Sequence, residues 1–206
     1  MRCPRKDIAK EGSGLQATAT SENSGVESRP GYGGWRVVAA ANFGVMVSFG
    51  ALLVYTFGIF LKPLTAEFHW SREEASRAFA LAAMTIAVVS PLLGVALDRW
   101  GPRRVIVPCF LALGGGVMAL SALDGSLWQF YAIFVVIGIA GNGTTQMGYS
   151  GAVTSWFDQK RGLALSIVLA GVGIGSIVHP VLAESWIAQY GWRTAYRIFG
   201  VMILVM

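Results

Sequence analysis

The 206-residue chain is 54% hydrophobic and only 13% charged, a composition too apolar for a water-soluble domain of this size. Its net charge of +5 does not indicate nucleic-acid binding, because the Lys and Arg residues fall in short clusters between long uncharged runs. We therefore expect a lipid bilayer, and not nucleic acid, as the partner of this chain.

Residues 1–34 differ in composition from the rest of the chain. They are rich in Gly, Ser and Thr, with scattered charges of both signs. Such a segment cannot bury enough apolar surface to fold, so we predict a disordered tail. The first apolar run begins only after this tail and is too long for a secretory signal, which predicts a retained membrane span.

Five runs without Asp, Glu, Lys or Arg follow the tail, and each reaches the roughly 20 residues that a helix needs to cross about 30 Å of hydrocarbon. Lipid offers no partner to backbone polar groups, and the runs lack the alternation of barrel strands, so we predict helices. Only nine residues follow Arg197, which predicts an incomplete sixth helix. The predicted fold is an all-α polytopic membrane bundle over residues 35–206, with spans at about 37–61, 75–97, 105–123, 128–150, 162–183 and 194–206.

Two local signals support these boundaries. Ser71 followed by Glu74 has the spacing of a capping box, which places the start of the second helix before its apolar part. The seven Trp residues all lie at or just outside the ends of apolar runs, as expected for amphipathic rings at the headgroup level.

The distribution of Lys and Arg predicts the orientation in the membrane. With a cytoplasmic N-terminus, the inside segments hold 11 of these residues and the outside segments hold 5. Cytoplasmic flanks of membrane helices carry the excess of positive charge. We expect a multi-pass protein of the inner (plasma) membrane with its tail in the cytoplasm.

The loop between the second and third predicted helices carries the most informative motif. Gly101 permits a tight turn, and Gly94 would allow close helix approach one turn before the helix end. A plain reading is a positively charged cytoplasmic loop that ends a helix with Gly and Pro. The full motif comprises Gly94, Asp98, Arg99, Gly101, Arg103 and Arg104.

This motif resembles the signature of the major facilitator superfamily, G-x-x-x-D-R/K-x-G-R-R/K-R/K, with Pro102 standing where the family usually has a basic residue. The resemblance implies a twelve-helix transporter of which this chain is the six-helix N-terminal half, built as two inverted three-helix repeats. It further implies that the loop latches the two halves on the cytoplasmic side, with Asp98 as the anion. Arg99, Arg103 and Arg104 would be the cations around it.

Other stretches resemble the monocarboxylate transporter and oxalate/formate antiporter branch, namely residues 34–38, 55–64, 156–157, 160–164 and 190–193. The resemblance implies a small organic anion, such as a mono- or dicarboxylate, as substrate. None of the five apolar runs contains a cation, so the pairing charge would come from the missing C-terminal half. Helix 4 lacks the Arg typical of sugar and drug members, and helix 1 lacks the Lys that monocarboxylate transporters often use, with Tyr55 near that position.

Polar residues within the spans are the candidates for a substrate cavity, because such residues tend to face a bundle interior. Asn142, Gln146 and Tyr149 are spaced i, i+4 and i+7, which predicts one shared face of helix 4, and Tyr55 lies in helix 1. The alternative is that these groups bond neighbouring helices. For Gly171 and Gly175 in helix 5, packing is favoured over a gating role, and for His179 a hydrogen-bonded packing role is favoured over a proton relay.

No catalytic residue set, metal site or cofactor motif emerges from the sequence. Ser, His and acidic residues do not cluster in the spans, and Cys3 and Cys109 have no CxxC spacing. We therefore expect a secondary active transporter working by alternating access and not an enzyme. The alternatives are a truncated membrane protein without transport activity and a transporter of another substrate class.

Overall fold

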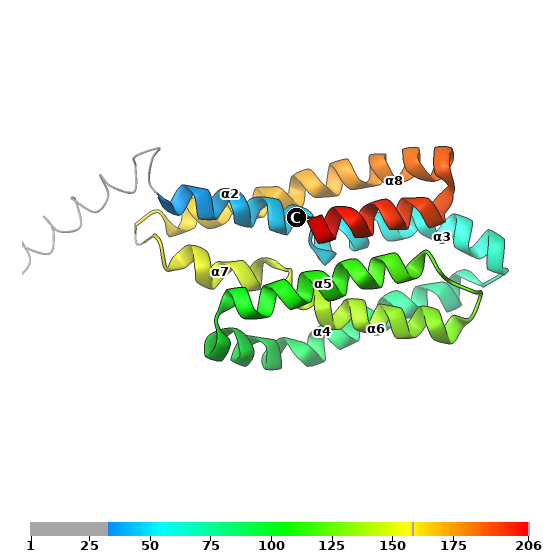
Figure 1. The fold of residues 1–206 in the computed structure, drawn as a ribbon, viewed down its shortest axis with the longest axis horizontal. Helices are drawn as coiled ribbons and strands as arrows, with labels where there is room; N and C mark the ends of the chain where they lie inside the picture. Colours follow the sequence, from blue (N-terminus) through cyan, green and yellow to red (C-terminus); the bar gives the residue numbers. More distant parts are fainter. Residues whose placement is uncertain (1–32, 158, 206) are drawn as a thin grey trace, which may run out of the picture.

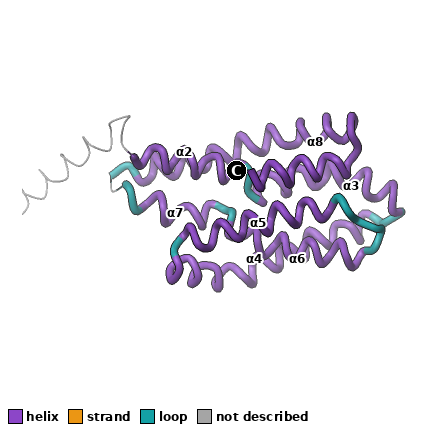
Figure 2. The backbone as a smooth tube through the Cα atoms, viewed as in Figure 1, coloured by secondary structure: helices purple, strands orange, loops and turns teal. Residues whose placement is uncertain are grey.

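The computed structural model describes residues 33–157 and 159–205 (Figure 1). The tail predicted for residues 1–34 therefore lies almost entirely outside the described residues. Within them every regular element is helical and no strand occurs, as Figure 2 shows, which confirms the predicted all-α class.

The helices follow one another as an up-and-down bundle whose long axis is horizontal in Figure 1. Turns gather at two ends: the predicted inner end holds residue 33 and the turn at Gly101, and the predicted outer end holds the turns at 69–71 and 121–126. The elements are α2 (Gly33–Met46), the π-helical turn η1 (Gly50–Val54), α3 (Tyr55–Phe68), α4 (Arg72–Trp100), α5 (Pro102–Leu120), α6 (Leu127–Gly143), α7 (Gln146–Thr154) and α8 (Arg161–Val205).

Two glycines with positive φ join consecutive helices directly. Gly101, between α4 and α5, has φ 80° and ψ 157°, and Gly191, inside α8, has φ 79° and ψ 161°. Only glycine adopts this backbone conformation without strain. Gly191 therefore divides α8 into two helices, residues 161–190 and 192–205, which fold back on each other and correspond to the predicted fifth and sixth spans (Figure 1).

Three helical segments are long and apolar enough by themselves to cross a membrane: Gly33–Phe68, Arg72–Trp100 and Arg161–Val205. Arg104–Leu120 and Leu127–Gly143 are apolar but shorter. The predicted spans at 37–61, 75–97 and 162–183 lie inside the long segments. The span predicted at 128–150 is not one helix, because the chain breaks between α6 and α7.

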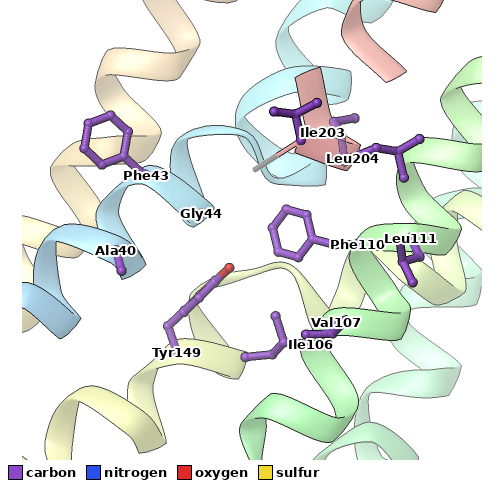
Figure 3. A pocket seen from close by; sticks show the side chains of 11 residues that line it. Ala40, Phe43, Gly44, Ile106, Val107, Phe110, Leu111, Tyr149, Ile203 and Leu204 are labelled. Carbon is purple, nitrogen blue, oxygen red and sulfur yellow. The ribbon is translucent and has the colours of Figure 1, made fainter. Parts of the chain in front are cut away.

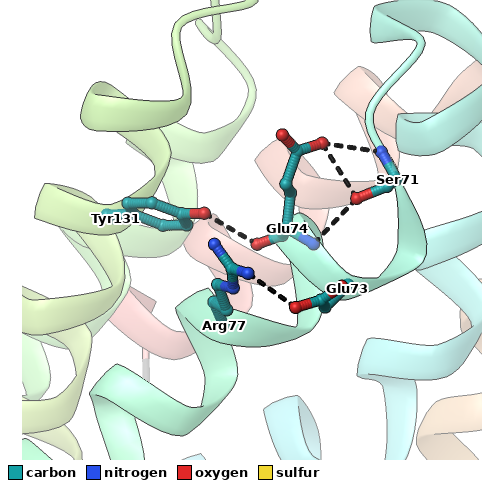
Figure 4. Close-up of polar contacts among 5 residues, drawn as sticks. All are labelled: Ser71, Glu73, Glu74, Arg77 and Tyr131. Atoms are coloured by element: carbon teal, nitrogen blue, oxygen red, sulfur yellow. Dashed lines mark hydrogen bonds and ion pairs between the residues drawn. The ribbon is translucent and has the colours of Figure 1, made fainter.

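The predicted capping box at the start of α4 is confirmed (Figure 4). The Ser71 hydroxyl accepts from the Glu74 N–H at 3.1 Å, and the Glu74 carboxylate accepts from the Ser71 N–H at 2.9 Å. The Tyr131 hydroxyl of α6 donates to the Glu74 carbonyl at 2.9 Å, which joins the beginnings of α4 and α6. The capping box satisfies two otherwise unpaired backbone N–H groups, those of Ser71 and Glu74.

Most of the apolar core lies toward the outer end, where the Phe60 ring stacks on the Tyr196 ring at 3.9 Å between centroids. A second, smaller cluster toward the inner end joins α2, α7 and the start of α8, and Trp35 packs edge-on against Phe157 there. The members of this second cluster are Val38, Ala41, Val45, Val153, Phe157, Ala164 and Val168.

The tryptophans differ in their exposure. Trp128 is 83% exposed and Trp100 is exposed as well, as the headgroup assignment predicts. Trp192 is instead buried, and its indole N–H donates to the Glu67 carboxylate at 2.6 Å. Arg193 also pairs with Glu67 at 2.9 Å. At the outer end, therefore, a polar cluster joins α3 to the second part of α8, and part of the predicted tryptophan belt belongs to the core.

Candidate functional site

The first span is discontinuous near its middle. Regular α-helix ends at Met46, the Ser48 N–H donates to the Val45 carbonyl at 3.2 Å, and a π turn, η1, follows before α3 begins. The Ser48 hydroxyl accepts from the Ala51 N–H at 3.4 Å inside this break. Gly-Ser pairs and π turns are established causes of such kinks, and Gly50 lies directly at the turn.

The fourth span is discontinuous as well. The hydroxyls of Thr144 and Thr145 donate to the carbonyls of Gly141 and Asn142, each at 2.8 Å. Such side-chain bonds compete with helical backbone bonds, and the flanking glycines lower the helix propensity further. Thr145 adopts an extended conformation, and α7 begins after it.

The break overturns the expectation that Asn142, Gln146 and Tyr149 share one helical face. Helical spacing places residues on one face only along a continuous helix, and Thr144 and Thr145 interrupt the helix between the first two residues. Asn142 belongs to α6, whereas Gln146 and Tyr149 belong to α7. The Gln146 side chain lies outside what the structure describes.

The two breaks meet each other inside the bundle. The Phe49 N–H donates to the Thr144 hydroxyl at 3.3 Å, so the backbone of the first break bonds a side chain of the second. A Cβ added at Gly141 would lie 2.7 Å from the Phe49 ring, which shows why a glycine is needed there. Irregular backbone at membrane depth is tolerated only where protein or a cavity satisfies it.

A cavity of about 340 Å³ lies at this meeting point. Four of its eight lining residues have polar side chains, Ser48, Ser90, Asn142 and Thr145, none is charged, and most of the exposed lining surface is apolar. The full lining comprises Val45, Ser48, Gly50, Ile86, Ser90, Asn142, Thr145 and Val172. The site thus places four polar side chains where two broken helices meet.

Asn142 lines this cavity and also joins two helices. Its side chain is 2% exposed, and its amide group donates to the Ser90 hydroxyl at 2.8 Å and to the Ile86 carbonyl at 3.2 Å, both on α4. Both residues that accept these bonds also line the cavity. The two readings of Asn142, helix contact and cavity wall, therefore describe the same arrangement.

Tyr149 lies in a different cavity, shown in Figure 3. This crevice of about 500 Å³ lies between α2, α5, α7 and the end of α8, and its other lining side chains are apolar. The Tyr149 hydroxyl points toward Gly44, where any Cβ would overlap it. An adjoining cavity toward the inner end is lined by Tyr149 together with Arg36 and Pro102.

Tyr55 lines neither the cavity at the helix breaks nor the crevice. It follows the π turn directly, at the start of α3, and is 50% exposed. The structure therefore does not bring the four predicted cavity residues together: Asn142 lies at the helix breaks, Tyr149 in the apolar crevice, and Tyr55 on the surface of the described chain.

The predicted latch motif lies at the turn between α4 and α5, at the same end as the start of α2 (Figure 1). Asp98, Arg99 and Arg104 are exposed, and among the described residues no hydrogen bond or ion pair reaches Asp98. The Arg103 side chain lies outside the described part of the structure. The side chains of Asp98, Arg99 and Arg104 are thus open to solvent or to a partner outside the described bundle.

Gly101 makes the tight turn predicted for it, but Gly94 does not mediate a close helix contact among the described residues. A Cβ added at Gly94 would meet no atom within 4 Å. Its neighbours on the same stretch of α4, such as Leu92 and Val95, are exposed. The close approach proposed for Gly94 would therefore need a partner other than the described helices.

Sequence reasoning missed the discontinuity of the first and fourth spans and the contribution of Ser90. The signal was present as small residues in mid-span: Ser48 and Gly50 in the first run, and Asn142 to Thr145 in the fourth. Interrupted hydrophobic segments in corresponding positions of two repeats are the sequence feature that marks a transporter's binding site. Among the described residues, no group of three or more potential metal ligands occurs.

Comparison with known proteins assigns the class that these features suggest. Residues 32–206 match the model of the Major Facilitator Superfamily. The chain belongs to this superfamily, and its likeness to monocarboxylate transporters confirms the branch that the sequence resembles. It is a multi-pass membrane protein of a transporter family, which confirms that it is not an enzyme.

Individual relatives carry different names. The chain is 31% identical over 176 residues to monocarboxylate transporter 13 of Rattus norvegicus, covering 83% of this chain and 39% of that protein. It is 30% identical over 114 residues to the riboflavin transporter RibJ of Trypanosoma brucei brucei, covering 55% and 21%. It is 23% identical over 162 residues to the uncharacterized MFS-type transporter YhjX of Escherichia coli, covering 79% and 40%. The chain spans about two fifths or less of the length of these relatives.

Proposed function

We propose that this chain forms the N-terminal half of a secondary active transporter that moves a small organic anion by alternating access. The observation that carries the proposal is the cavity, lined by four polar residues, at the contact between two broken helices, Phe49 of the first span and Thr144 of the fourth. Broken helices in a membrane supply backbone groups to a solute, and transporters with repeated halves bind substrate at such places.

The charge of the cavity bears on the substrate class. Four uncharged polar side chains, Ser48, Ser90, Asn142 and Thr145, line it. Neutral groups alone replace the hydration of a carboxylate poorly, so an anion needs a cation from the second half. The monocarboxylate transporters among the relatives favour a mono- or dicarboxylate as the substrate.

A neutral or weakly charged polar solute is the second candidate, favoured by the uncharged lining and by the riboflavin transporters among the relatives. The two candidates differ in what the missing half must contain. A carboxylate requires a cation opposite the cavity, whereas a neutral solute requires only further hydrogen-bonding groups.

The motif at the turn between α4 and α5 is proposed to be the cytoplasmic latch. Exposed Asp98 and Arg104 have the charges to bind the second half in one of the two conformers of the transport cycle. With the latch on the cytoplasmic side, the N-terminus lies in the cytoplasm as well. The proposed location is the inner (plasma) membrane. The alternative is a remnant without transport activity. It predicts that even a longer form of the protein, if one exists, would transport no solute.

The test is uptake into proteoliposomes that hold either the 206-residue chain or a full-length parent protein. We expect saturable uptake of labelled lactate, formate or oxalate by the parent and none by the chain alone, which should still insert in the bilayer. Saturable riboflavin uptake with no carboxylate uptake would favour the second candidate. Saturable uptake by the chain alone would show that a self-paired half suffices and would contradict the role of a second half.

A further inference from the structure

His179 is the one histidine that the described helices enclose, and the transport proposal so far gives it no role. It lies in α8, is 1% exposed, and its Nδ1 lies 3.1 Å from the Ala51 carbonyl oxygen of the π turn. The Phe199 ring packs edge-on against the imidazole, with 6.0 Å between centroids. The imidazole therefore bridges the fifth span and the break in the first span.

The π turn explains why the Ala51 carbonyl can accept this bond. In a regular α-helix the Tyr55 N–H would donate to the Ala51 carbonyl, four residues earlier. Here the Tyr55 N–H donates to the Leu52 carbonyl instead. The Ala51 oxygen therefore lacks its usual Tyr55 partner, and a carbonyl oxygen, which has two lone pairs, can accept from the imidazole.

The chemistry of the bond fixes the tautomer of His179. A carbonyl oxygen can only accept a hydrogen bond, so Nδ1 must carry the proton. In the neutral imidazole Nε2 is then left without a proton. A backbone carbonyl that holds one ring nitrogen is the usual way in which a protein selects a histidine tautomer.

Two glycines of α8 bring the helices close enough for this bond. A Cβ added at Gly175 would lie 2.6 Å from the Met46 carbonyl and 2.9 Å from the Ala51 Cβ. Gly171, one turn earlier, contacts the Asn42 backbone in the same way. Gly171, Gly175 and His179 therefore form a strip, spaced every four residues, that contacts the first span at Asn42, Met46 and Ala51.

We propose that His179 is a positioning residue for the cavity at the helix breaks. Its Nδ1–H holds the π turn against α8, and the π turn in turn places Ser48 and Gly50 in the cavity wall. The role rests on the proposed transport function, because it concerns the wall of that same cavity. It requires a hydrogen-bond donor at the Nδ1 position and does not require proton uptake.

The first test reads the tautomer directly and does not depend on transport. The chain has two histidines, so a His69→Asn variant leaves His179 as the only one, and Asn tolerates the left-handed conformation of position 69. Nitrogen NMR of the ¹⁵N-histidine-labelled variant in lipid should find Nδ1 protonated and Nε2 unprotonated at neutral pH. A proton on Nε2 alone would overturn the proposal.

The second test uses two substitutions that differ in where they place an amide donor. An Asn amide nitrogen occupies nearly the position of Nδ1, whereas a Gln amide nitrogen reaches the position of Nε2. In the full-length parent we expect His179→Asn to keep transport within about twofold. We expect His179→Gln and His179→Ala to raise the KM about tenfold, as loss of a buried hydrogen bond would.

The pH profile separates positioning from proton transfer. Since Asn does not titrate, an unchanged pH dependence of uptake in His179→Asn is expected if His179 only positions the π turn. Loss of pH-dependent uptake in that variant would assign a proton-carrying role and overturn the proposal, as would equal activity of the Asn, Gln and Ala variants. If the parent transports nothing, the transport proposal fails, while the tautomer result still decides whether the bond exists.

Discussion

The close contact between the first and fifth spans predicts that one added methyl group at Gly171 will destabilise the bundle. A Cβ there would lie 2.5 Å from the Asn42 carbonyl oxygen and 3.0 Å from its side-chain nitrogen. Favourable contacts need about 3.5 Å, so the helices would have to separate by about 1 Å. The Asn42 amide also donates to the Ile167 carbonyl at 2.6 Å, and this bond would be strained by the same displacement.

Gly173 provides a matched control in the same helix. A Cβ at Gly173 would meet no atom within 4 Å. Gly173→Ala and Gly171→Ala gain the same helix propensity, about 1 kcal/mol, so this gain cancels between them. Overpacking costs about 1–3 kcal/mol, and we expect Gly171→Ala to be less stable than Gly173→Ala by that amount.

The assay is unfolding of the purified 206-residue chain in mild detergent, monitored by tryptophan fluorescence. The two variants and the unmodified chain are measured side by side. A difference of about 1–3 kcal/mol corresponds to a shift of roughly fivefold to more than a hundredfold in the unfolding equilibrium at 25 °C. Equal stability of the two variants would refute the close approach of the two helices at Gly171.

Three further predictions concern the ends of the bundle. Asp98→Asn in the full-length parent should leave insertion intact and reduce uptake several-fold, because it weakens a charge-assisted contact of about 1.5–3 kcal/mol in one conformer. Uptake equal to that of the wild type would contradict the latch role and leave the motif as a basic loop that ends a helix. Ser71→Ala should cost about 1 kcal/mol in the same unfolding assay by removing the capping box, whereas Ser166→Ala, with its hydroxyl bonded within its own helix, should cost less. Cysteines introduced at positions 98–104 should resist an impermeant reagent applied from outside, and a cysteine at Gly125 should react; the reverse pattern would invert the topology.

The elements that sequence patterns predicted are those set by local interactions. Uncharged runs located the apolar helices, Ser71 and Glu74 located the start of α4, and Gly101 located a turn whose φ of 80° only glycine adopts easily. Each of these depends on a few neighbouring residues and on the bilayer as solvent. The superfamily motif added the class of protein, because its spacing is specific.

The parts that the sequence did not predict depend on contacts between distant segments. The break at Thr144 and Thr145 is stabilised by Phe49, 95 residues away from Thr144. The burial of Trp192 depends on Glu67, 125 residues away. Helical spacing assumed one continuous fourth span and so assigned Tyr149 to the same face as Asn142. No periodicity argument includes such cross-helix partners, whereas the mid-span glycines and hydroxyls were a usable signal.

The central claim is that substrate binds in the cavity at the helix breaks and not in the larger crevice that Tyr149 lines. Val172 lines the first cavity and Phe43 lines the second, so each position can carry a reporter cysteine in a parent protein whose native cysteines are replaced by Ser. The measurement is the rate of alkylation by a small thiol reagent with and without saturating substrate. We expect substrate to slow the reaction of Val172→Cys and to leave that of Phe43→Cys unchanged; protection at Phe43→Cys alone would contradict the account.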